Sequence, residues 1–106
     1  ISINWIDWDN KSCGLGYWIS EDKVGKGIVN RCCKSLINNL ILNNQIHRFV
    51  IEAAVENHAS RKVAENLGMR LEGIIKDREL LYGAYVDAAL YAITAPEWYL
   101  FTRSSS

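Results

Sequence analysis

Two glycines flank a lysine at Gly25-Lys26-Gly27, and an amphipathic pattern begins immediately after them. A glycine-rich turn before a helix leaves backbone N–H groups without internal partners, and such amides bind anions such as pyrophosphate. Lys26 would then add a point charge, or would simply keep the turn soluble. The spacing matches neither the P-loop nor the G-x-G-x-x-G fingerprint. Taken alone, the segment is compatible with a plain loop as well as with a phosphate cradle.

Glu52 and His58 are candidate acid–base groups by residue type alone. Glu52 lies inside His47–Val55, a nearly continuous apolar run that looks buried on both faces, where a carboxylate is costly unless it is paired or functional. His58 is a lone histidine in a polar segment, so we expect it to be exposed to solvent. The aromatic side chains are interpreted as core or groove lining rather than as catalytic groups; they include Trp18, Tyr82, Tyr85 and Tyr91.

The cysteines do not form a metal or disulfide pattern. Cys13 is isolated, while Cys32 and Cys33 are adjacent, which suits neither zinc spacing nor a disulfide framework. Both members of the pair fall on the apolar face of the helix expected below. We therefore interpret all three as core or surface thiols, and a redox or zinc protein is disfavoured.

Composition limits the class of protein. With 106 residues, 49% of them hydrophobic, the chain is long enough for one domain with a single core. Twelve basic and twelve acidic side chains balance, which argues against nucleic-acid binding. No apolar run approaches the ~20 residues of a membrane span, and the start lacks the features of a signal peptide. We expect a cytoplasmic protein, and because the sequence begins at Ile1 rather than Met, we expect a processed chain or a fragment.

The first twenty residues read as a hairpin. Residues 1–8 alternate as a strand does, residues 9–12 have turn chemistry, and residues 13–20 form a second apolar strand. Gly14 and Gly16 are costly inside a strand, so they indicate a bulge or a close backbone approach.

A long helix then leads into a buried strand. From Gly27, apolar residues at 28, 29, 32, 33, 36, 37, 40 and 41 make one stripe, and the helix should end near Asn43-Asn44. Residues 47–55 follow as a strand, so strand, helix and strand imply a right-handed parallel crossover. Asn57 or Ser60 is expected to cap a short helix that Gly68 closes.

The rest of the chain predicts more strand and a last helix. Residues 70–76 and 79–93 read as a hairpin or strand pair with a turn at Tyr82-Gly83-Ala84, and a helix starts at Pro96. Residues 1–101 form a single domain, and residues 102–106 look like a frayed tail. The fold class is therefore α/β (α+β), with a mixed, mainly antiparallel sheet around a central parallel βαβ crossover.

Three stretches resemble the GNAT N-acetyltransferase superfamily. They are GYWISEDKVGKGI, RFVIEAAVENHASRKVAENLGMRLEG and LLYGAYVDAALYAI, which together cover most of residues 14–93 in the family's order. They are most similar to the RimJ/RimL-like branch, which acetylates protein N-termini, including those of ribosomal proteins. The resemblance implies a partial GNAT acyl-CoA N-acyltransferase fold.

The resemblance also implies a site for acetyl-CoA. The pantetheine arm would run between the strands that end near Ser20 and Val55, and Asn57 would bond that arm. The pyrophosphate would lie on the backbone amides at the start of the long helix, from Val24 through Gly25, Lys26, Gly27 and Ile28 to Val29.

By the same resemblance, an acetyl group would move to a primary amine, such as the N-terminal amine of a protein. Ser60 would protonate the leaving thiolate, and Glu21 would accept a proton from the amine. Each has another interpretation, since Ser60 also suits a helix cap and Glu21 a solvated turn. Glu52 and His58 remain alternative bases.

Members of this family are considerably longer, and the resemblance begins at their middle strands. We therefore expect the cofactor half of an enzyme; the alternative is a non-catalytic CoA-binding or self-associating fragment. Residues 1–8 would form an exposed edge carrying Ile3 and Trp5, which predicts a homo-oligomer.

Overall fold

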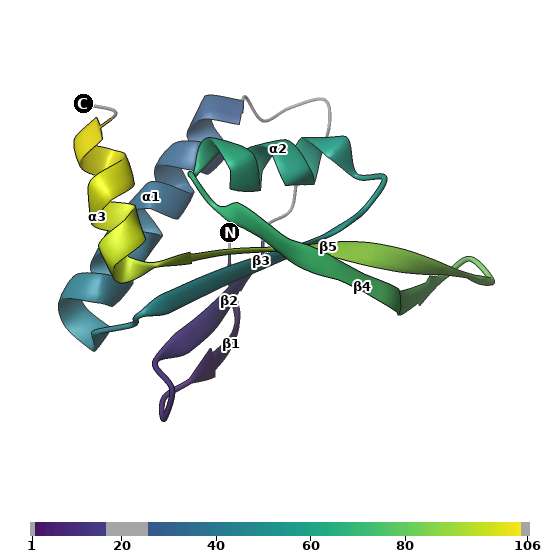
Figure 1. The fold of residues 1–106 in the computed structure, drawn as a ribbon, viewed down its shortest axis with the longest axis horizontal. Helices are drawn as coiled ribbons and strands as arrows, with labels where there is room; N and C mark the ends of the chain where they lie inside the picture. The colour runs from purple at the N-terminus through teal and green to yellow at the C-terminus, as the bar shows by residue number, and fades with distance from the viewer. Residues whose placement is uncertain (1, 17–25, 105–106) are drawn as a thin grey trace.

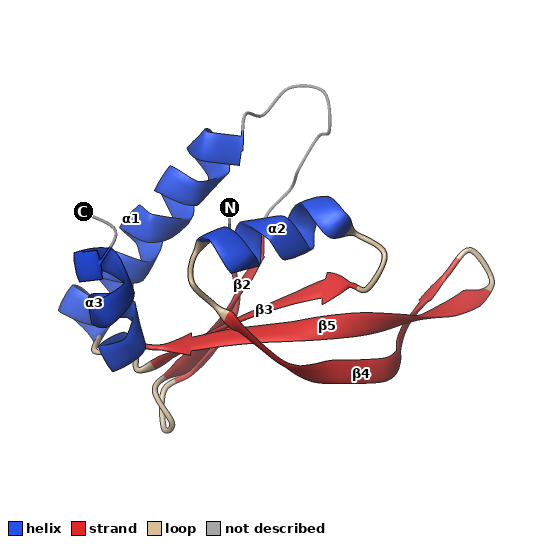
Figure 2. Cartoon of the chain, turned by 45° about the horizontal axis from the view of Figure 1, so that its top comes forward, coloured by secondary structure: helices blue, strands red, loops and turns tan. Residues whose placement is uncertain are grey.

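The fold is given by a computed structural model that describes residues 2–16 and 26–104, with the side chains of residues 3–16 and 30–103. Within these ranges, five strands form one sheet, and three helices pack together with it (Figures 1 and 2). The sheet order is β1-β2-β3-β5-β4. None of the described helices is long and apolar enough to cross a bilayer.

The predicted hairpin at the start is confirmed. Strand β1 (Ser2–Asp7) pairs antiparallel with β2 (Ser12–Gly16), and the register shifts between Ile3 and Trp5. A Cβ atom placed on Gly14 would lie 2.1 Å from Nε1 of Trp5, so only glycine lets the indole lie on β2. Bulge and close approach are both present, as the glycines indicated. Residues 17–20 of the predicted strand lie outside the described part.

The predicted long helix and buried strand are also confirmed. Helix α1 (Lys26–Asn44) precedes β3 (Arg48–Ala54), which pairs in parallel with β2. The buried positions of α1 include Cys33 and Ile37, as the apolar stripe required. Cys32 is exposed, so its predicted place on the apolar face is wrong. The stripe at this turn is narrower than the run of apolar letters suggests.

Helix α2 (His58–Asn66) begins at an Asn57 cap, whose side chain accepts a hydrogen bond from the Ser60 backbone N–H at 3.1 Å. Asn57, not Ser60, is therefore the cap. At the other end Gly68 follows the C-cap with a φ of +78°, a conformation that favours glycine, and its N–H bonds the Glu65 carbonyl. The predicted closure of this helix is confirmed.

The second hairpin is longer than predicted. Strand β4 (Arg70–Leu81) runs through residues 77–78 without a break, because a register irregularity between Ile75 and Glu79 absorbs them. It turns at Tyr82-Gly83 into β5 (Ala84–Thr94), and the hairpin extends beyond the end of β3 (Figure 1). Helix α3 (Ala95–Ser104) ends the described chain and includes part of the expected tail.

The two faces of the sheet differ because strand side chains alternate. One face packs against all three helices and forms the core. The opposite face carries the ion pairs described below. The buried core residues from the strands are Cys13, Leu15, Phe49, Ile51, Ala89, Tyr91 and Ile93, and those from the helices and the C-cap of α2 are Cys33, Ile37, Leu40, Val63, Ala64, Leu67 and Trp98.

Candidate active site

Strands β2 and β3 separate partway along their length. Their pairing runs from Ser12 opposite Arg48 to Gly14 opposite Val50 and ends there, although β3 continues to Ala54. On its other side β3 stays paired with β5 as far as Ala54. Among residues 2–16 and 26–104, no strand pairs with this end of β3 on the β2 side, an arrangement that an extended ligand arm would require.

The start of α1 supplies donors of the kind predicted for pyrophosphate. The helix begins at Lys26, so the amides of residues 26–29 belong to its first turn, where N–H groups lack partners within the helix. The helix dipole adds positive potential there. Glu21, Val24 and Gly25 lie outside the described residues, as do the side chains of residues 26–29.

The turn from β3 to α2 brings two predicted residues together at the open end of β3. The N–H of Asn57 donates to the Ala54 carbonyl at 2.8 Å, which folds the chain back as soon as the strand ends. Asn57 then caps α2, because its Oδ1 accepts the Ser60 N–H. Ser60 lies in the first turn of α2. The predicted pair is therefore adjacent in the structure.

Two cavities adjoin this end of β3. One of about 280 Å³ lies along the edge of β3 and the β4–β5 hairpin, and one of about 510 Å³ lies between the hairpin and the β3–α2 turn. Three residues, Ala54, Val86 and Asp87, line both. The larger cavity is also lined by Val55, Glu56, Asn57, Leu81 and Tyr85, and the smaller one by Glu52, Ala53, Arg78, Glu79 and Ala88.

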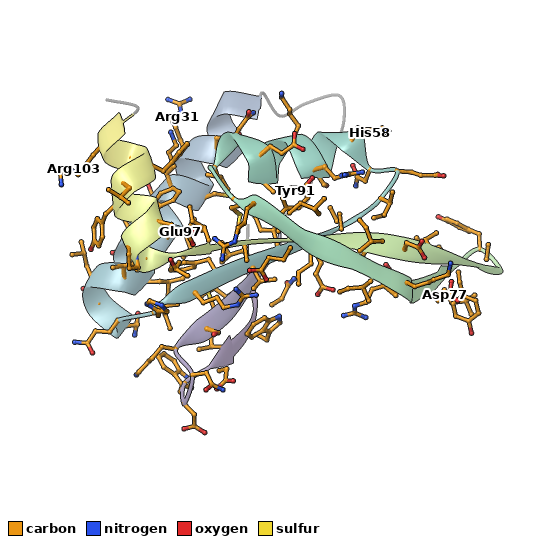
Figure 3. All side chains as sticks on the ribbon, in the orientation of Figure 1. Arg31, His58, Asp77, Tyr91, Glu97 and Arg103 are labelled. Carbon is orange, nitrogen blue, oxygen red and sulfur yellow. The ribbon has the colours of Figure 1, made fainter. Side chains whose placement is uncertain are left out.

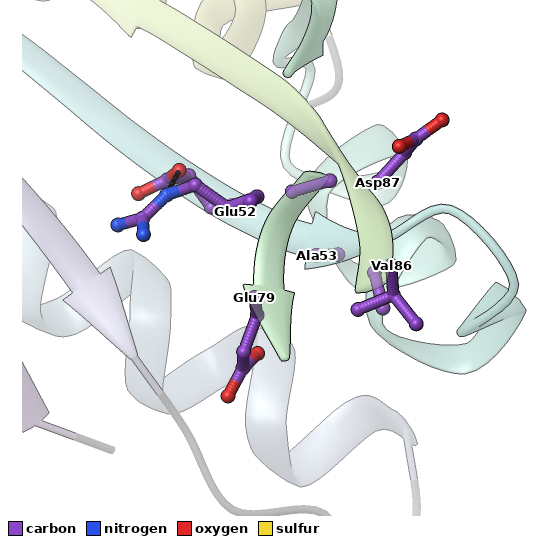
Figure 4. A pocket seen from close by; sticks show the side chains of 8 residues that line it. Glu52, Ala53, Glu79, Val86 and Asp87 are labelled. Atoms are coloured by element: carbon purple, nitrogen blue, oxygen red, sulfur yellow. Dashed lines mark hydrogen bonds and ion pairs between the residues drawn. The ribbon is translucent and has the colours of Figure 1, made fainter. Parts of the chain in front are cut away.

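Glu52 differs from its prediction. It points away from the core and accepts a hydrogen bond from Arg78 Nε at 2.9 Å, with 29% of its side chain exposed (Figure 4). The expectation that β3 is buried on both faces is thus wrong at this position. The same hydrogen bond raises the pKa of the Arg78 guanidinium. Glu79 and Asp87 point away from each other on either side of the hairpin (Figure 4).

Asp87 is a residue of this site that the sequence did not single out. Its carboxylate accepts the N–H of Asp77 at 2.9 Å, and its carbonyl accepts the N–H of Val55 at the same distance. Asp77 has a φ of +49°, at the irregularity of β4. One residue therefore holds both the bulged hairpin and the end of β3. The available signal was a lone carboxylate inside an apolar strand pattern.

The other candidate residues differ in their exposure to solvent. His58 is exposed at the start of α2, as expected. Tyr91 is buried in the core and Tyr85 lines the larger cavity, which agrees with their interpretation. Tyr82 is fully exposed at the hairpin tip, so its assignment to core or groove is wrong. Trp18 lies outside the described residues.

A family model described as an acetyltransferase (GNAT) domain matches residues 1–70. The chain belongs to the GNAT acetyltransferase family. A ribosomal-protein-serine acetyltransferase of Escherichia coli (strain K12) is 40% identical over 92 residues, which are 87% of this chain and 51% of that relative. The putative ribosomal N-acetyltransferase YdaF of Bacillus subtilis (strain 168) is 35% identical over 98 residues, covering 92% of this chain and 54% of its own.

A solved GNAT structure supports the same assignment. RimL, a ribosomal L7/L12 alpha-N-protein acetyltransferase in complex with Coenzyme A, is similar with a TM-score of 0.81 and 37% identity, over 87% of this chain and 52% of that one. The predicted family and fold class are therefore confirmed. The GNAT chain described here spans about half the length of these relatives.

Proposed function

We propose that this chain forms the acetyl-CoA-binding part of an N-acetyltransferase that acts on a primary amine, such as the N-terminal amine of a ribosomal protein. The observation that carries the proposal is the end of β2–β3 pairing at Gly14 and Val50, while β3 continues to Ala54. Among the described residues, the Ala54 end of β3 has a paired strand on its β5 side alone, next to the Asn57–Ser60 turn. The named acceptors of its relatives support the choice of substrate.

Each part of acetyl-CoA has a matching feature. The amides of residues 24–29 would hold the pyrophosphate; those of residues 26–29 belong to the first turn of α1, where N–H groups lack partners within the helix. The pantetheine arm lies in the opening beside the last residues of β3. Asn57 donates from Nδ2 to that arm, because its Oδ1 already caps α2.

When bound, acetyl-CoA supplies an acetyl group activated as a thioester. Ser60 donates a proton to the departing sulfur, and its place in the first turn of α2 lets the helix dipole favour negative charge there. Glu21 accepts a proton from the attacking amine. Glu52 is the alternative base, because it lines the smaller cavity, although its bond to Arg78 holds it in an ion pair.

The smaller cavity suits a cationic acceptor. Glu52 and Glu79 line it beside the guanidinium of Arg78, while the carboxylate of Asp87 points to the other side of the hairpin (Figure 4). A net negative lining raises the local concentration of an ammonium group. Its acidic character thus supports an amine as the acceptor.

The test is acetyl transfer by the full-length protein, followed as release of free thiol from acetyl-CoA. We expect release with peptides that carry the N-terminal sequences of ribosomal proteins, and much less with the same peptides blocked at the α-amine. Equal release from free and blocked peptides, or none from either, would contradict the proposed acceptor.

A second candidate function is a self-associating CoA-binding module, which exposed side chains of β1 and of the turn after it favour. Ile3, Trp5 and Trp8 are 38%, 43% and 52% exposed, and β1 lies at the edge of the sheet. Unpaired edges recruit other strands. We propose that this edge pairs with a second copy, so light scattering of the 106-residue chain at micromolar concentration should give at least a dimer. A monomer of 12.0 kDa would contradict this pairing.

A further inference from the structure

Arg61 occupies a position that helix electrostatics disfavour. It lies in the first turn of α2, where the positive end of the helix dipole repels a cation. Its side chain does not extend into solvent, however. It is half-buried and reaches back toward the turn that precedes the helix. An unfavourable charge position that is held by specific contacts requires an explanation.

The Arg61 guanidinium joins three elements. Nη1 donates to the Val55 carbonyl at 2.9 Å, and Nε donates to the hydroxyl of Tyr91 at 3.2 Å. Val55 is the first residue after β3, and Tyr91 belongs to β5. The Tyr91 hydroxyl in turn donates to Glu65 Oε2 at 3.1 Å, one helical turn after Arg61. Tyr91 lies between α2 and the sheet, with 2% of its surface exposed (Figure 3).

These contacts fix the turn that carries Asn57 and Ser60. Val55 is held on both sides, because its N–H donates to the Asp87 carbonyl at 2.9 Å and its C=O accepts from Arg61. The residues that follow make local bonds: Asn57 N–H donates to the Ala54 carbonyl, and Ser60 N–H donates to the Asn57 side chain. Arg61 therefore links this turn to the buried Tyr91 through side-chain hydrogen bonds.

We propose that Arg61 is a positioning residue, which holds the Val55–Ser60 turn in the geometry that the acetyl-CoA site needs. This role rests on the proposed function, in which Asn57 binds the pantetheine arm and Ser60 protonates the thiolate. Arg61 touches neither ligand nor reacting atoms in this account. It acts through Val55 and through the start of α2.

The test compares Arg61→Gln with Lys62→Gln in the full-length protein. Lys62 is the next residue of α2, and it is exposed, so its variant removes the same charge from the same helix without touching the turn. Amide hydrogen exchange at Asn57 and Ser60 reports the turn directly. Calorimetry reports acetyl-CoA affinity at a temperature well below unfolding, where a purely structural role would leave affinity unchanged.

We expect Arg61→Gln to exchange both amides about tenfold faster and to weaken acetyl-CoA binding by about three- to tenfold, as the loss of one or two hydrogen bonds would do. Lys62→Gln should match the parent in both measurements. Tyr91→Phe, which removes a single hydroxyl, should show a smaller change in the same direction and serves if Arg61→Gln does not fold.

The outcomes separate the two proposals. If the parent protein binds acetyl-CoA and Arg61→Gln binds it equally well, with only a lower melting temperature, the positioning role is wrong and the proposed function stands. If the parent does not bind acetyl-CoA at all, both are overturned. If Tyr91→Phe and Arg61→Gln both keep the parent's exchange rates at Asn57 and Ser60, the link through Arg61 does not exist.

Discussion

The two ends of β3 are held in opposite ways. At the Arg48 end the strand has a neighbour on each side, Phe49 is fully buried, and Arg48 Nη1 bonds Glu72 across the sheet at 3.0 Å. At the Ala54 end β5 is the one described strand that pairs with it, and two cavities adjoin it. Backbone groups that stabilise a sheet cannot also bind a ligand. One strand is therefore paired on both sides at its Arg48 end, while its Ala54 end is where we propose that acetyl-CoA binds.

The largest effect is expected from a substitution at the Arg48 end of β3, the closed end, which has a neighbouring strand on each side. Phe49→Ala removes a ring with no exposed surface from the core, which typically costs about 3–5 kcal/mol of unfolding free energy. Glu52→Gln changes an exposed ion pair near the open end, and such pairs contribute about 0–1 kcal/mol. Urea denaturation of both variants measures the contrast. Equal losses would show that the two ends do not differ in stability.

At the Ala54 end of β3, the open end, the expected effect is on the rate of acetyl transfer. Ser60→Ala in the full-length protein should lower turnover by about a hundredfold or more, since general acids contribute on that scale. Acetyl-CoA affinity should change little, because an acid acts on the departing thiolate rather than on the bound ground state. The two constants come from steady-state kinetics and calorimetry. Turnover equal to that of the parent would show that Ser60 is not the acid in this reaction.

A smaller effect, on the melting temperature, is expected when the pH is lowered. The hydrogen bond from Arg70, followed by bonds from Thr94, lowers the pKa of Glu97 from 4.5 to about 2, and bonding by Arg48 lowers the pKa of Glu72. Because these pKa values are lower in the folded than in the unfolded chain, their stabilisation is complete above about pH 4.5 and is lost as the pH falls toward 2. Melting temperature should fall over this window.

The variant that tests this effect is Glu97→Gln, which removes the carboxyl group whose pKa is lowered to about 2. Its melting temperature should be lower than the parent's at pH 6 and should depend less on pH between 4.5 and 2. Both proteins can be followed by circular dichroism in the same buffers. Parallel curves for the two would show that the Arg70–Glu97 pair does not contribute to acid sensitivity.

The smallest perturbation of the protein is the labelling of its cysteines by a thiol reagent. Burial raises the pKa of the Cys13 thiol to about 11, and that of Cys33 likewise. Cys13 pairs with Phe49 at the closed end, whereas Cys32 is exposed on α1. A thiol reagent at pH 8 should label one cysteine per native chain and three in urea. Labelling of Cys13 as fast as Cys32 would show that the closed end opens readily.

The local pattern predicted most of the fold. The apolar stripe of α1, the turn at residues 9–12 and the glycines of β2 each depend on neighbouring residues, so they could be found in the sequence. The family resemblance added the expected roles of Asn57 and Ser60, and the structure places those two residues in one turn.

Contacts between distant segments could not be predicted in the same way. Glu52 bonds Arg78, and Arg61 bonds Tyr91. Both contacts depend on the irregularities in β4 and on the order of the strands in the sheet. The exposure of Cys32 likewise depends on where the other helices lie. Such pairings need the register of the whole sheet, which no single segment contains.

The central claim is that acetyl-CoA binds at the open end of β3, with its pyrophosphate on the first turn of α1. Calorimetry with acetyl-CoA tests this most directly, on the parent, Gly27→Val and the control Gly73→Val. A Cβ on Gly73 would meet nothing within 4 Å, so that variant should fold and bind like the parent. Gly27→Val should show no binding, because a branched side chain keeps the phosphates from the amides. Parent-like binding by folded Gly27→Val would contradict the claim.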